Sequence, residues 1–349
     1  MFGRVRSWFT PDLAVDLGSS AVRIAVPGTD LLLEEPAVVA LQQGTRRILG
    51  RGTAVGKLAH QMLGRTPDSI TAMRPIQQGV IADYELCEAM LRYFLRKTGR
   101  VRAGWRPRLL MTVPGFTTAV ERRAVFNSAE RAGASQVFLL SAAKAAAIGA
   151  GLPISEPLAN LVCQIGAGTT EIAVLSLSEV VASKSLRFGG QDFDAAIVES
   201  VRQVHSLKIG LQTAEQVKLS IGSAWPLEVE KTGEVRGLDL RSSVPRKLLL
   251  TNNDLRNALR HPLAVCLAAI KSVIEQCDPE LVSDLSETGL TLCGGTAQLP
   301  GLDVFFQEQL GIPVRRAPFP ALSGIQGATI CTEHLDRWRD NFETSDRAA

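Results

Sequence analysis

The sequence has few aromatic residues, almost no net charge and no cysteines at metal-binding spacing. Aromatic residues make up 5% of the 349 residues, which favours an α/β protein over an aromatic-rich β-sandwich. The formal net charge is only +3, so the chain lacks the basic excess of a dedicated nucleic-acid binder. The 46% hydrophobic and 21% charged residues are an ordinary globular balance and exclude disorder and collagen-like repeats.

Cysteine and histidine give no metal or redox signature. The six cysteines lie far apart, mostly in apolar runs, and the four histidines are equally scattered. We therefore expect buried, reduced thiols and no disulfide scaffold.

No stretch predicts a membrane span or a secretory signal. The longest nearly apolar stretch, 137–152, is interrupted by Lys144 and is too short to cross a bilayer. The basic start of the chain is followed by Pro11, Asp12 and Asp16 instead of an apolar signal-peptide core.

The first nine residues predict an amphipathic helix that binds a membrane surface. The side chains at helical spacing are Phe2, Arg4, Val5, Arg6, Trp8 and Phe9. The same pattern also fits a flexible tail that covers the core. A second basic cluster, between 92 and 108, surrounds Trp105 and favours contact with anionic lipids.

The length predicts two domains, and an internal repeat supports this division. Residues 161–174 align without a gap on residues 13–26, and Gly166 stands 148 positions after Gly18. Both segments are predicted to form a strand, a tight glycine turn and a second strand.

Such turns can hold phosphate, because a bare backbone approaches closely and several amides converge on the anion. Two of them in register predict a nucleotide clamped between two domains. A third glycine turn, 292–297, follows an apolar strand and opens a helix, so its amides are candidates for nucleoside or phosphate contact.

These three motifs, in this order, resemble those of the actin, Hsp-type chaperone and sugar-kinase superfamily. The segments between them resemble the MreB family of bacterial actins, from about Phe9 to about Leu335. Matching segments include Glu34–Ala40, Arg74–Asp83, Val120–Ala124, Ala145–Leu152, Gly189–Asp194 and Ile221–Ala224.

The resemblance implies an α/β, actin-like, duplicated ribonuclease-H-like fold with two domains split into four subdomains around a nucleotide cleft. Residues 1–9 are the expected membrane-binding segment, and 339–349 are an expected mobile tail. The expected subdomains are IA (10–33, 76–145 and 321–338), IB (34–75), IIA (146–182 and 247–320) and IIB (183–246).

The resemblance also implies a function. It indicates a cytoplasmic, actin-like cytoskeletal protein that binds ATP or ADP with Mg²⁺ and forms filaments on the inner face of the cytoplasmic membrane. Such filaments help to set cell shape by organising cell-wall synthesis. The expected partners are further copies of the chain, anionic inner-membrane lipids and membrane proteins of the wall-elongation machinery, and no nucleic acid.

The resemblance places the nucleotide-binding residues on three loops and one helix. They are Asp16, Gly18, Ser19, Ser20 and Ala21; Gly166, Ala167, Gly168, Thr169 and Thr170; Glu215 and Lys218; and Gly294, Gly295, Thr296 and Ala297. Asp16 is the implied ligand of Mg²⁺, through water. Thr169 and Gln164 stand at positions of the hydrolytic site.

Three acids of the family pattern are missing. Gln164 replaces the Asp that opens the second loop, Ala142 replaces the Glu that positions the attacking water, and Gln191 replaces a third acid. Loss of a group that orients or deprotonates water slows hydrolysis about 10²–10⁴-fold. Gln164 can still orient a water by hydrogen bonding. We therefore expect nucleotide binding with slow or absent hydrolysis.

Other functions fit the sequence less well. The missing acids argue against a sugar kinase, and no residues after Leu335 are expected to form the second domain of an Hsp-type chaperone. A vestigial cleft that binds no nucleotide is one alternative. The other is a non-hydrolysing, non-filamentous actin-fold scaffold that regulates or copolymerises with a catalytically intact MreB.

Overall fold

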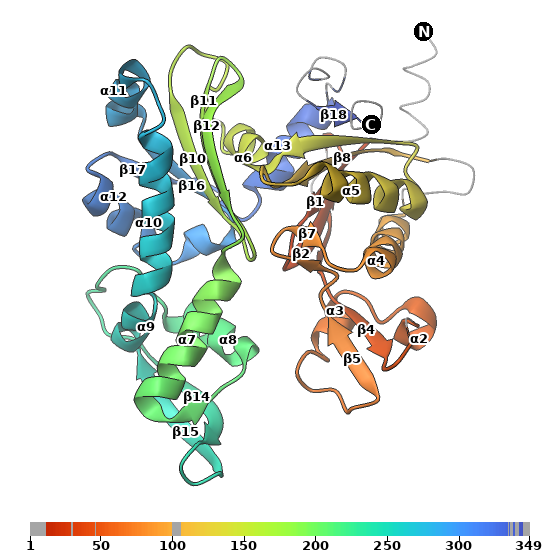
Figure 1. Cartoon of the computed structure of the whole chain (residues 1–349), viewed down its shortest axis with the longest axis vertical. Helices are drawn as coiled ribbons and strands as arrows, with labels where there is room; N and C mark the ends of the chain where they lie inside the picture. The colour runs from red at the N-terminus through yellow and green to blue at the C-terminus, as the bar shows by residue number, and fades with distance from the viewer. Residues whose placement is uncertain are drawn as a thin grey trace. The chain divides into compact units, whose positions relative to one another are not determined.

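The computed structural model describes residues 12–28, 31–45, 47–99, 106–333, 335, 338 and 342–344. The chain forms two compact units (Figure 1). One unit contains Met1–Leu152 and Leu322–Ala349, and the other contains Pro153–Ala321.

The first unit is built on a six-stranded sheet with the order β18-β9-β8-β1-β2-β3. The first three strands in the chain pair antiparallel, whereas β8 is parallel to both β1 and β9. The strands are β1 (Leu13–Leu17), β2 (Ala21–Ala25), β3 (Leu31–Pro36), β8 (Arg108–Val113), β9 (Gln136–Ser141) and β18 (Glu343–Thr344).

Helices cover both faces of this sheet, because alternate residues of its strands are apolar on both sides. On one face, Val15 and Met111 pack with α4 (Tyr84–Lys97) and α5 (Ala119–Ala132). On the other, Ala14 and Leu110 pack with α6 (Ala142–Gly149) and α13 (Ser323–Glu333). Helix α5 begins with a capping box between Thr118 and Glu121, which satisfies its first free amides.

A smaller subassembly follows β3 in the chain. Its elements are β4 (Val39–Gln42), α2 (Leu49–Gly52), α3 (Lys57–His60), β5 (Ile70–Met73), β6 (Ile76–Gln77) and β7 (Val80–Ile81). Buried Glu35 connects this part to the main sheet: its carboxylate accepts from Lys97 Nζ at 2.6 Å and from the Lys57 amide at 2.9 Å.

The second unit is built on a five-stranded sheet with the order β12-β11-β10-β16-β17. The strands are β10 (Asn160–Ile165), β11 (Thr170–Ser176), β12 (Glu179–Leu186), β16 (Leu290–Cys293) and β17 (Val314–Arg316). Its other elements are α7 (Gly190–His205), α10 (Arg260–Ile274), α11 (Pro279–Thr288), the short 3₁₀ helix η1 (Gly295–Gln298) and α12 (Leu302–Leu310).

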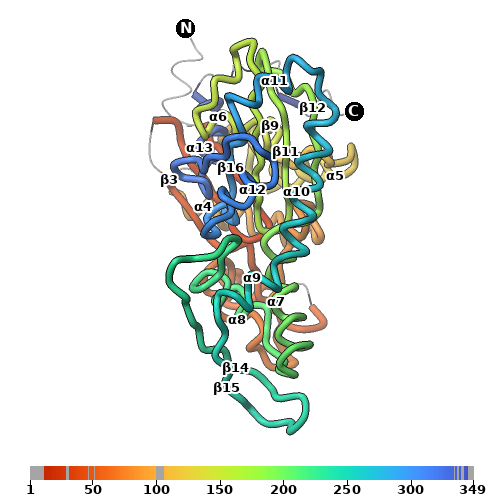
Figure 2. Tube along the Cα trace, turned by 90° about the vertical axis from the view of Figure 1, so that its left-hand side faces the viewer, coloured from red at the N-terminus to blue at the C-terminus, as the bar shows by residue number. Residues whose placement is uncertain are grey.

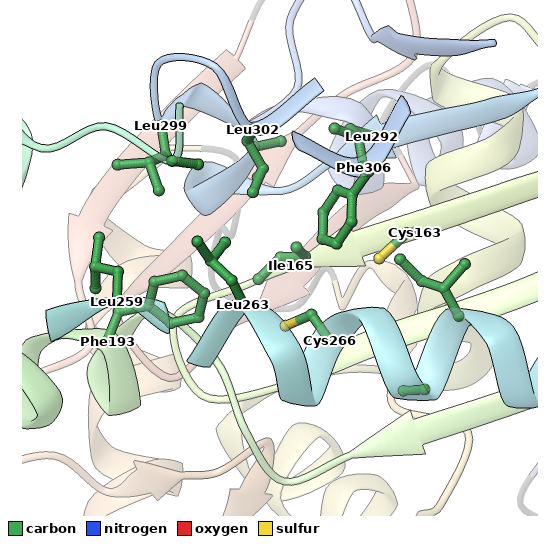
Figure 3. Packing of buried hydrophobic residues seen from close by; sticks show 14 of the residues in the cluster. Cys163, Ile165, Phe193, Leu259, Leu263, Cys266, Leu292, Leu299, Leu302 and Phe306 are labelled. Carbon is green, nitrogen blue, oxygen red and sulfur yellow. The ribbon is translucent and has the colours of Figure 1, made fainter. Parts of the chain in front are cut away.

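One face of this sheet carries the main core of the unit. Figure 3 shows Leu263 and Cys266 of α10 pointing toward Cys163 and Ile165 of β10, with Phe306 of α12 beside them. All six cysteines are free thiols and five of them are buried, in agreement with the expectation from the sequence.

A three-stranded sheet extends the second unit. It has the order β13-β14-β15, and β14 and β15 run side by side in both views (Figure 2). The elements are β13 (Leu207–Lys208), α8 (Leu211–Ile221), β14 (Thr232–Asp239), β15 (Pro245–Thr251) and α9 (Asn252–Ala258).

The two main sheets repeat one another, as the sequence predicts. The order β3-β2-β1-β8-β9 of the first unit matches the order β12-β11-β10-β16-β17 of the second. The hairpins share their register: Leu17 pairs with Val22, and 148 positions later Ile165 pairs with Thr170. The sequence repeat is therefore a repeat of the fold.

Several predicted features lie outside the described residues. They include the membrane residues Phe2, Arg4, Val5, Arg6, Trp8, Phe9 and Trp105. Over the parts of the chain that are described, no helix has the length and apolar character needed to cross a membrane.

The expected mobile tail contains a short segment that packs on the first unit. Phe342 is buried against the ring of Phe138, with 5.9 Å between ring centroids. Glu343 and Thr344 form β18, which pairs antiparallel with β9. Glu343 also forms an ion pair with Arg122 on α5. The polar composition of the segment does not reveal these contacts, because they depend on residues far away in the sequence.

Candidate functional site

The first phosphate loop is a tight turn between β1 and β2. The Gly18 amide donates to the Ala21 carbonyl at 3.1 Å and closes the turn. A Cβ atom on Gly18 would lie 2.8 Å from that carbonyl oxygen, so the turn needs glycine there.

Residues from 74 to 79 support this loop. Arg74 Nη1 donates to the carbonyls of Ser19 at 3.3 Å and Ser20 at 3.2 Å. The Gly79 amide donates to Ser19 Oγ at 2.9 Å. The segment Arg74–Asp83 resembles the family in sequence, but the sequence predicts no role for it in the site. No local pattern shows that the chain returns at this segment to the first phosphate loop.

Asp16 lies on β1, between Arg23 on β2 and Thr112 on β8. Thr112 Oγ1 donates to Asp16 Oδ1 at 2.7 Å, and Arg23 Nη1 lies 3.5 Å from Asp16 Oδ2. Arg23 also donates through Nε to Glu34 at 2.9 Å. Sequence reasoning missed Arg23, although its place directly across the hairpin from Asp16 follows from the two-residue-period strand pattern.

The second phosphate loop repeats the geometry of the first. The Gly166 amide donates to the Thr169 carbonyl at 2.8 Å. The carbonyls of Gly166 and Ala167 accept from the amides of Gly190, at 2.9 Å, and Gln191, at 2.8 Å. The second loop is therefore fastened to the beginning of α7.

The third glycine turn, 292–297, is called the adenosine turn after the contact that the family resemblance implies for it, and it lies beside the second loop. Thr296 Oγ1 donates to the Gly166 carbonyl at 3.2 Å. Gly294 has φ +86°, and a Cβ there would lie 2.3 Å from the Ile165 carbonyl oxygen, so only glycine fits. Gly295, Thr296 and Ala297 form η1, which follows β16 directly.

Lys218 of α8 joins the same group. Its Nζ lies 2.7 Å from Asp194 Oδ1 and donates to the Gly190 carbonyl at 2.9 Å. Both side chains of this ion pair are almost buried. Glu215 lies almost one turn earlier on α8 and is half-buried. The structure thus brings together the second loop, the start of α7, Lys218 and the adenosine turn.

Two positions where the family pattern predicts hydrolytic acids carry no carboxylate. Ala142 is the first residue of α6 and is buried. Gln164 lies on β10, and its buried Oε1 has no hydrogen-bond partner within the described part of the chain. Across the hairpin from Gln164 is Glu171, whose Oε2 accepts from Ser185 Oγ at 2.6 Å.

Lys144 does not replace the missing acid. It lies in the first turn of α6 and is buried. Burial raises the pKa of the Cys331 thiol on α13 to about 12, and the charge of Lys144 opposes that rise. Its charge therefore acts on α13, the helix that packs against α6.

The donor set does not fit Mg²⁺ well. Among the described residues, no group of three His, Cys, Asp or Glu side chains is arranged to hold a metal ion. Asp16 is the one carboxylate at the expected position, and it is already bonded to Arg23 and Thr112. Mg²⁺ prefers hard, charged oxygen ligands around its retained waters.

Comparison with protein families and known proteins gives a consistent result. A family model described as MreB/Mbl protein matches residues 10–340. The chain is 45% identical over 339 residues to the cell shape-determining protein MreB of Escherichia coli K12, covering 96% of this chain and 97% of that protein. It is 40% identical over 329 residues to the cell shape-determining protein Mbl of Bacillus cereus, covering 94% and 98%.

Solved structures show the same fold. MreB5 of Spiroplasma citri bound to AMPPNP has a TM-score of 0.88 at 30% identity and covers 95% of this chain and 98% of that chain. The MamK double helical filament has a TM-score of 0.77 at 18% identity and covers 93% and 99%, so it supports the fold alone. The fold is actin-like, as the sequence predicts.

Proposed function

Because the chain belongs to the MreB/Mbl family, we propose that it is an actin-like cytoskeletal protein that helps to determine cell shape. Two relatives at 45% and 40% identity, matched over nearly their whole length, are cell shape-determining proteins. The matched region contains both phosphate loops and the adenosine turn.

The proposed ligand of the chain is ATP or ADP. The observation that carries this proposal is the pair of glycine-closed loops, in which Gly18 and Gly166 make the same amide-to-carbonyl contact three residues ahead. Such loops direct backbone amides toward an anion. A relative of the same fold, MreB5 of Spiroplasma citri, has been solved with AMPPNP and with ADP.

Calorimetry with ADP and AMPPNP tests nucleotide binding. We expect saturable binding to the wild-type chain and a loss of at least about tenfold in affinity in Gly18→Val, because a side chain there meets the Ala21 carbonyl. Gly210→Ala is the matched control, since a Cβ there has open space. A chain that binds neither nucleotide has a vestigial site, which contradicts the proposal.

We further propose that hydrolysis is slow or absent. Ala142 cannot orient or deprotonate water, and Gln164 has only an uncharged amide at its position. Thr169 contributes its carbonyl to closing the second loop. We do not expect Mg²⁺ at Asp16, because both oxygens of its carboxylate already contact Thr112 and Arg23.

The proposed assembly is a filament of many copies on a membrane. The proposed membrane contact is made by residues 1–9 and Trp105, with anionic lipids and proteins of the wall-elongation machinery as partners on the inner face of the cytoplasmic membrane. Electron microscopy with and without ATP, on anionic lipid, tests filament formation.

A second candidate function is favoured by the missing acids. Ala142 and Gln164 stand where the family pattern has carboxylates. A chain that lacks both acids suits a non-hydrolysing, non-filamentous scaffold that regulates or copolymerises with an intact MreB. Persistent monomers on lipid, together with nucleotide binding, would favour the scaffold. Filaments of the purified chain would favour the cytoskeletal function.

A further inference from the structure

We infer that nucleotide binding by this chain does not depend on Mg²⁺, because Arg23 occupies the carboxylate to which the ion's water shell would attach. The inference rests on the proposed nucleotide binding and specifies its metal requirement.

Arg23 lies in the middle of a row of charged side chains across three strands. Asp16 on β1 is directly opposite Arg23 on β2, and Arg23 is directly opposite Glu34 on β3. Directly opposite residues in antiparallel strands project to the same face of the sheet, so the three side chains meet. Figure 1 shows β1 and β2 adjacent in the first unit.

The contacts in this row use both carboxylate oxygens of Asp16. Oδ1 accepts from Thr112 at 2.7 Å, and Oδ2 is 3.5 Å from Arg23 Nη1. Glu34 holds Arg23 in place through Nε at 2.9 Å and Nη2 at 2.8 Å. The Arg23 and Asp16 side chains are each only 17% exposed, so water screens this pair only partly.

Two physical effects then act against a metal ion at Asp16. A hydrated Mg²⁺ needs acceptor oxygens for its water ligands, and each oxygen of Asp16 already faces one protein donor, which leaves fewer acceptor sites for those waters. A divalent cation beside the guanidinium of Arg23 also experiences like-charge repulsion, which is strong where solvent is scarce.

The repeat supplies a comparison inside the same molecule. The equivalents of Asp16 and Arg23 in the second unit are Gln164 and Glu171, which face each other across the second hairpin. Gln164 carries no charge, and Glu171 is 2% exposed and accepts from Ser185. Neither row therefore presents an unpaired, accessible carboxylate to a metal ion.

The nucleotide phosphates then depend on groups that need no metal. Those groups are the backbone amides of the two glycine loops, whose turns are closed by hydrogen bonds within the chain. We expect free ADP and Mg-ADP to bind with affinities that agree within about threefold, less than 1 kcal/mol.

The test is calorimetry of the full chain with ADP, once with excess Mg²⁺ and once with excess EDTA. Wild type should bind ADP equally well with Mg²⁺ and with EDTA. The same should hold for Arg23→Lys, which keeps the positive charge. Arg23→Leu frees Asp16 and should bind at least about tenfold more tightly with Mg²⁺ than with EDTA. Arg202→Leu is the control, since Arg202 is an exposed arginine paired with Glu199 on α7.

The outcomes separate the two proposals. Wild-type binding that strengthens tenfold or more with Mg²⁺ overturns this inference and leaves the proposed nucleotide function intact. No binding in either condition overturns both. If Arg23→Leu does not fold, as judged by its thermal unfolding, the wild-type and Arg23→Lys titrations still decide the matter.

Discussion

At the scale of single residues, the two halves of the repeat keep their backbone geometry and differ in the side chains that carry charge. Gly18 and Gly166 close their turns in the same way, yet Asp16 in one hairpin corresponds to Gln164 in the other. We therefore expect this chain to keep anion binding by backbone amides while lacking water activation by carboxylates.

Two adjacent glycines in the adenosine turn provide a matched test of the site's geometry. Gly294→Ala forces a side chain into a left-handed conformation and against the Ile165 carbonyl. We expect it to lower the free energy of unfolding by more than about 2 kcal/mol. A Cβ atom on Gly295 would lie in open space, so Gly295→Ala should change the free energy of unfolding by less than about 1 kcal/mol. Equal urea midpoints for the two variants would contradict the described turn.

An ion pair between buried Glu35 and half-exposed Lys97 in the first unit predicts a dependence of stability on pH. Burial by itself would raise the pKa of Glu35, but the hydrogen bonds from Lys97 and the Lys57 amide and the two lysine charges outweigh it and lower the pKa. The contribution of Glu35 to the free energy of unfolding is therefore fully present above the ordinary carboxyl pKa of about 4.3. It is lost as the pH falls through the lower pKa that Glu35 has in the folded protein.

Glu35→Gln should accordingly destabilise the protein by about 1 kcal/mol at neutral pH, since Lys97 is half-exposed. The difference in urea midpoint from wild type should shrink below about pH 4.3. Glu308→Gln, at an exposed position on α12, is the control and should match wild type. If the difference in urea midpoint between wild type and Glu35→Gln grew as the pH was lowered, the prediction would be wrong.

Residue patterns predict the glycines of the site better than its polar contacts. The loop glycines have a local cause, a tight turn between two apolar strands, and are visible in the sequence. The contacts of Arg23 with Asp16, and of Arg74 with the loop carbonyls, depend on strand register and on a return of the chain 54 or 55 residues later. The Arg23 contact lies within one hairpin and follows once its register is known, whereas the Arg74 contacts have no local signal.

At the scale of elements, α6 and α13 pack with their backbones in direct contact. A Cβ on Gly327 would lie 1.8 Å from the Ala145 carbonyl oxygen, and one on Gly149 would lie 1.9 Å from that of Ser323. The backbones of the two helices therefore touch, which small residues alone permit. Helix α6 begins with Ala142 directly after β9 ends at Ser141, so Ala142 stands at the carboxyl end of that strand.

Enlarging one of these glycines should separate the helices. Gly327→Ala is expected to cost about 1–3 kcal/mol or more, because overpacking at a backbone contact cannot relax through a side-chain rotamer. Ile330→Ala, on the exposed side of the same helix, should cost no more than about 0.5 kcal/mol. Thermal unfolding of the two variants measures the difference, and a stable Gly327→Ala would refute the close contact.

Strands and turns are predictable from the sequence where apolar residues alternate regularly or where a segment is repeated. The two hairpins and the third glycine turn appear at the predicted places, because alternating apolar residues and glycine turns are local signals. Strand β18 was not predictable, since its two residues depend on docking against β9. The family resemblance, and not periodicity, supplied the actin-like topology.

At the scale of the whole molecule, membrane attachment and polymerisation are expected to be coupled. Full burial of Phe2, Trp8 or Phe9 contributes roughly 1.5–3 kcal/mol each, and each arginine adds about 1 kcal/mol at an anionic surface. Folding of the segment offsets much of this, so one copy is a weak anchor. Many copies in a filament convert a weak contact into stable attachment.

Sedimentation with anionic liposomes tests this coupling. The amount of protein that pellets should fall sharply in a chain without Met1–Phe9 and in Trp8→Glu. It should fall less in the control Trp338→Glu, which changes another tryptophan of the first unit. Zwitterionic liposomes serve as the lipid control and should pellet little protein. Pelleting that is unchanged by the deletion would disprove the anchor.

The measurement that tests the central claim most directly is phosphate release from ATP by the purified chain, made beside nucleotide binding in the same buffer. We predict that wild type binds ADP and AMPPNP but releases phosphate at least about 10²-fold more slowly than Ala142→Glu/Gln164→Asp, which restores both acids. Wild-type turnover equal to that of the double variant would contradict the account.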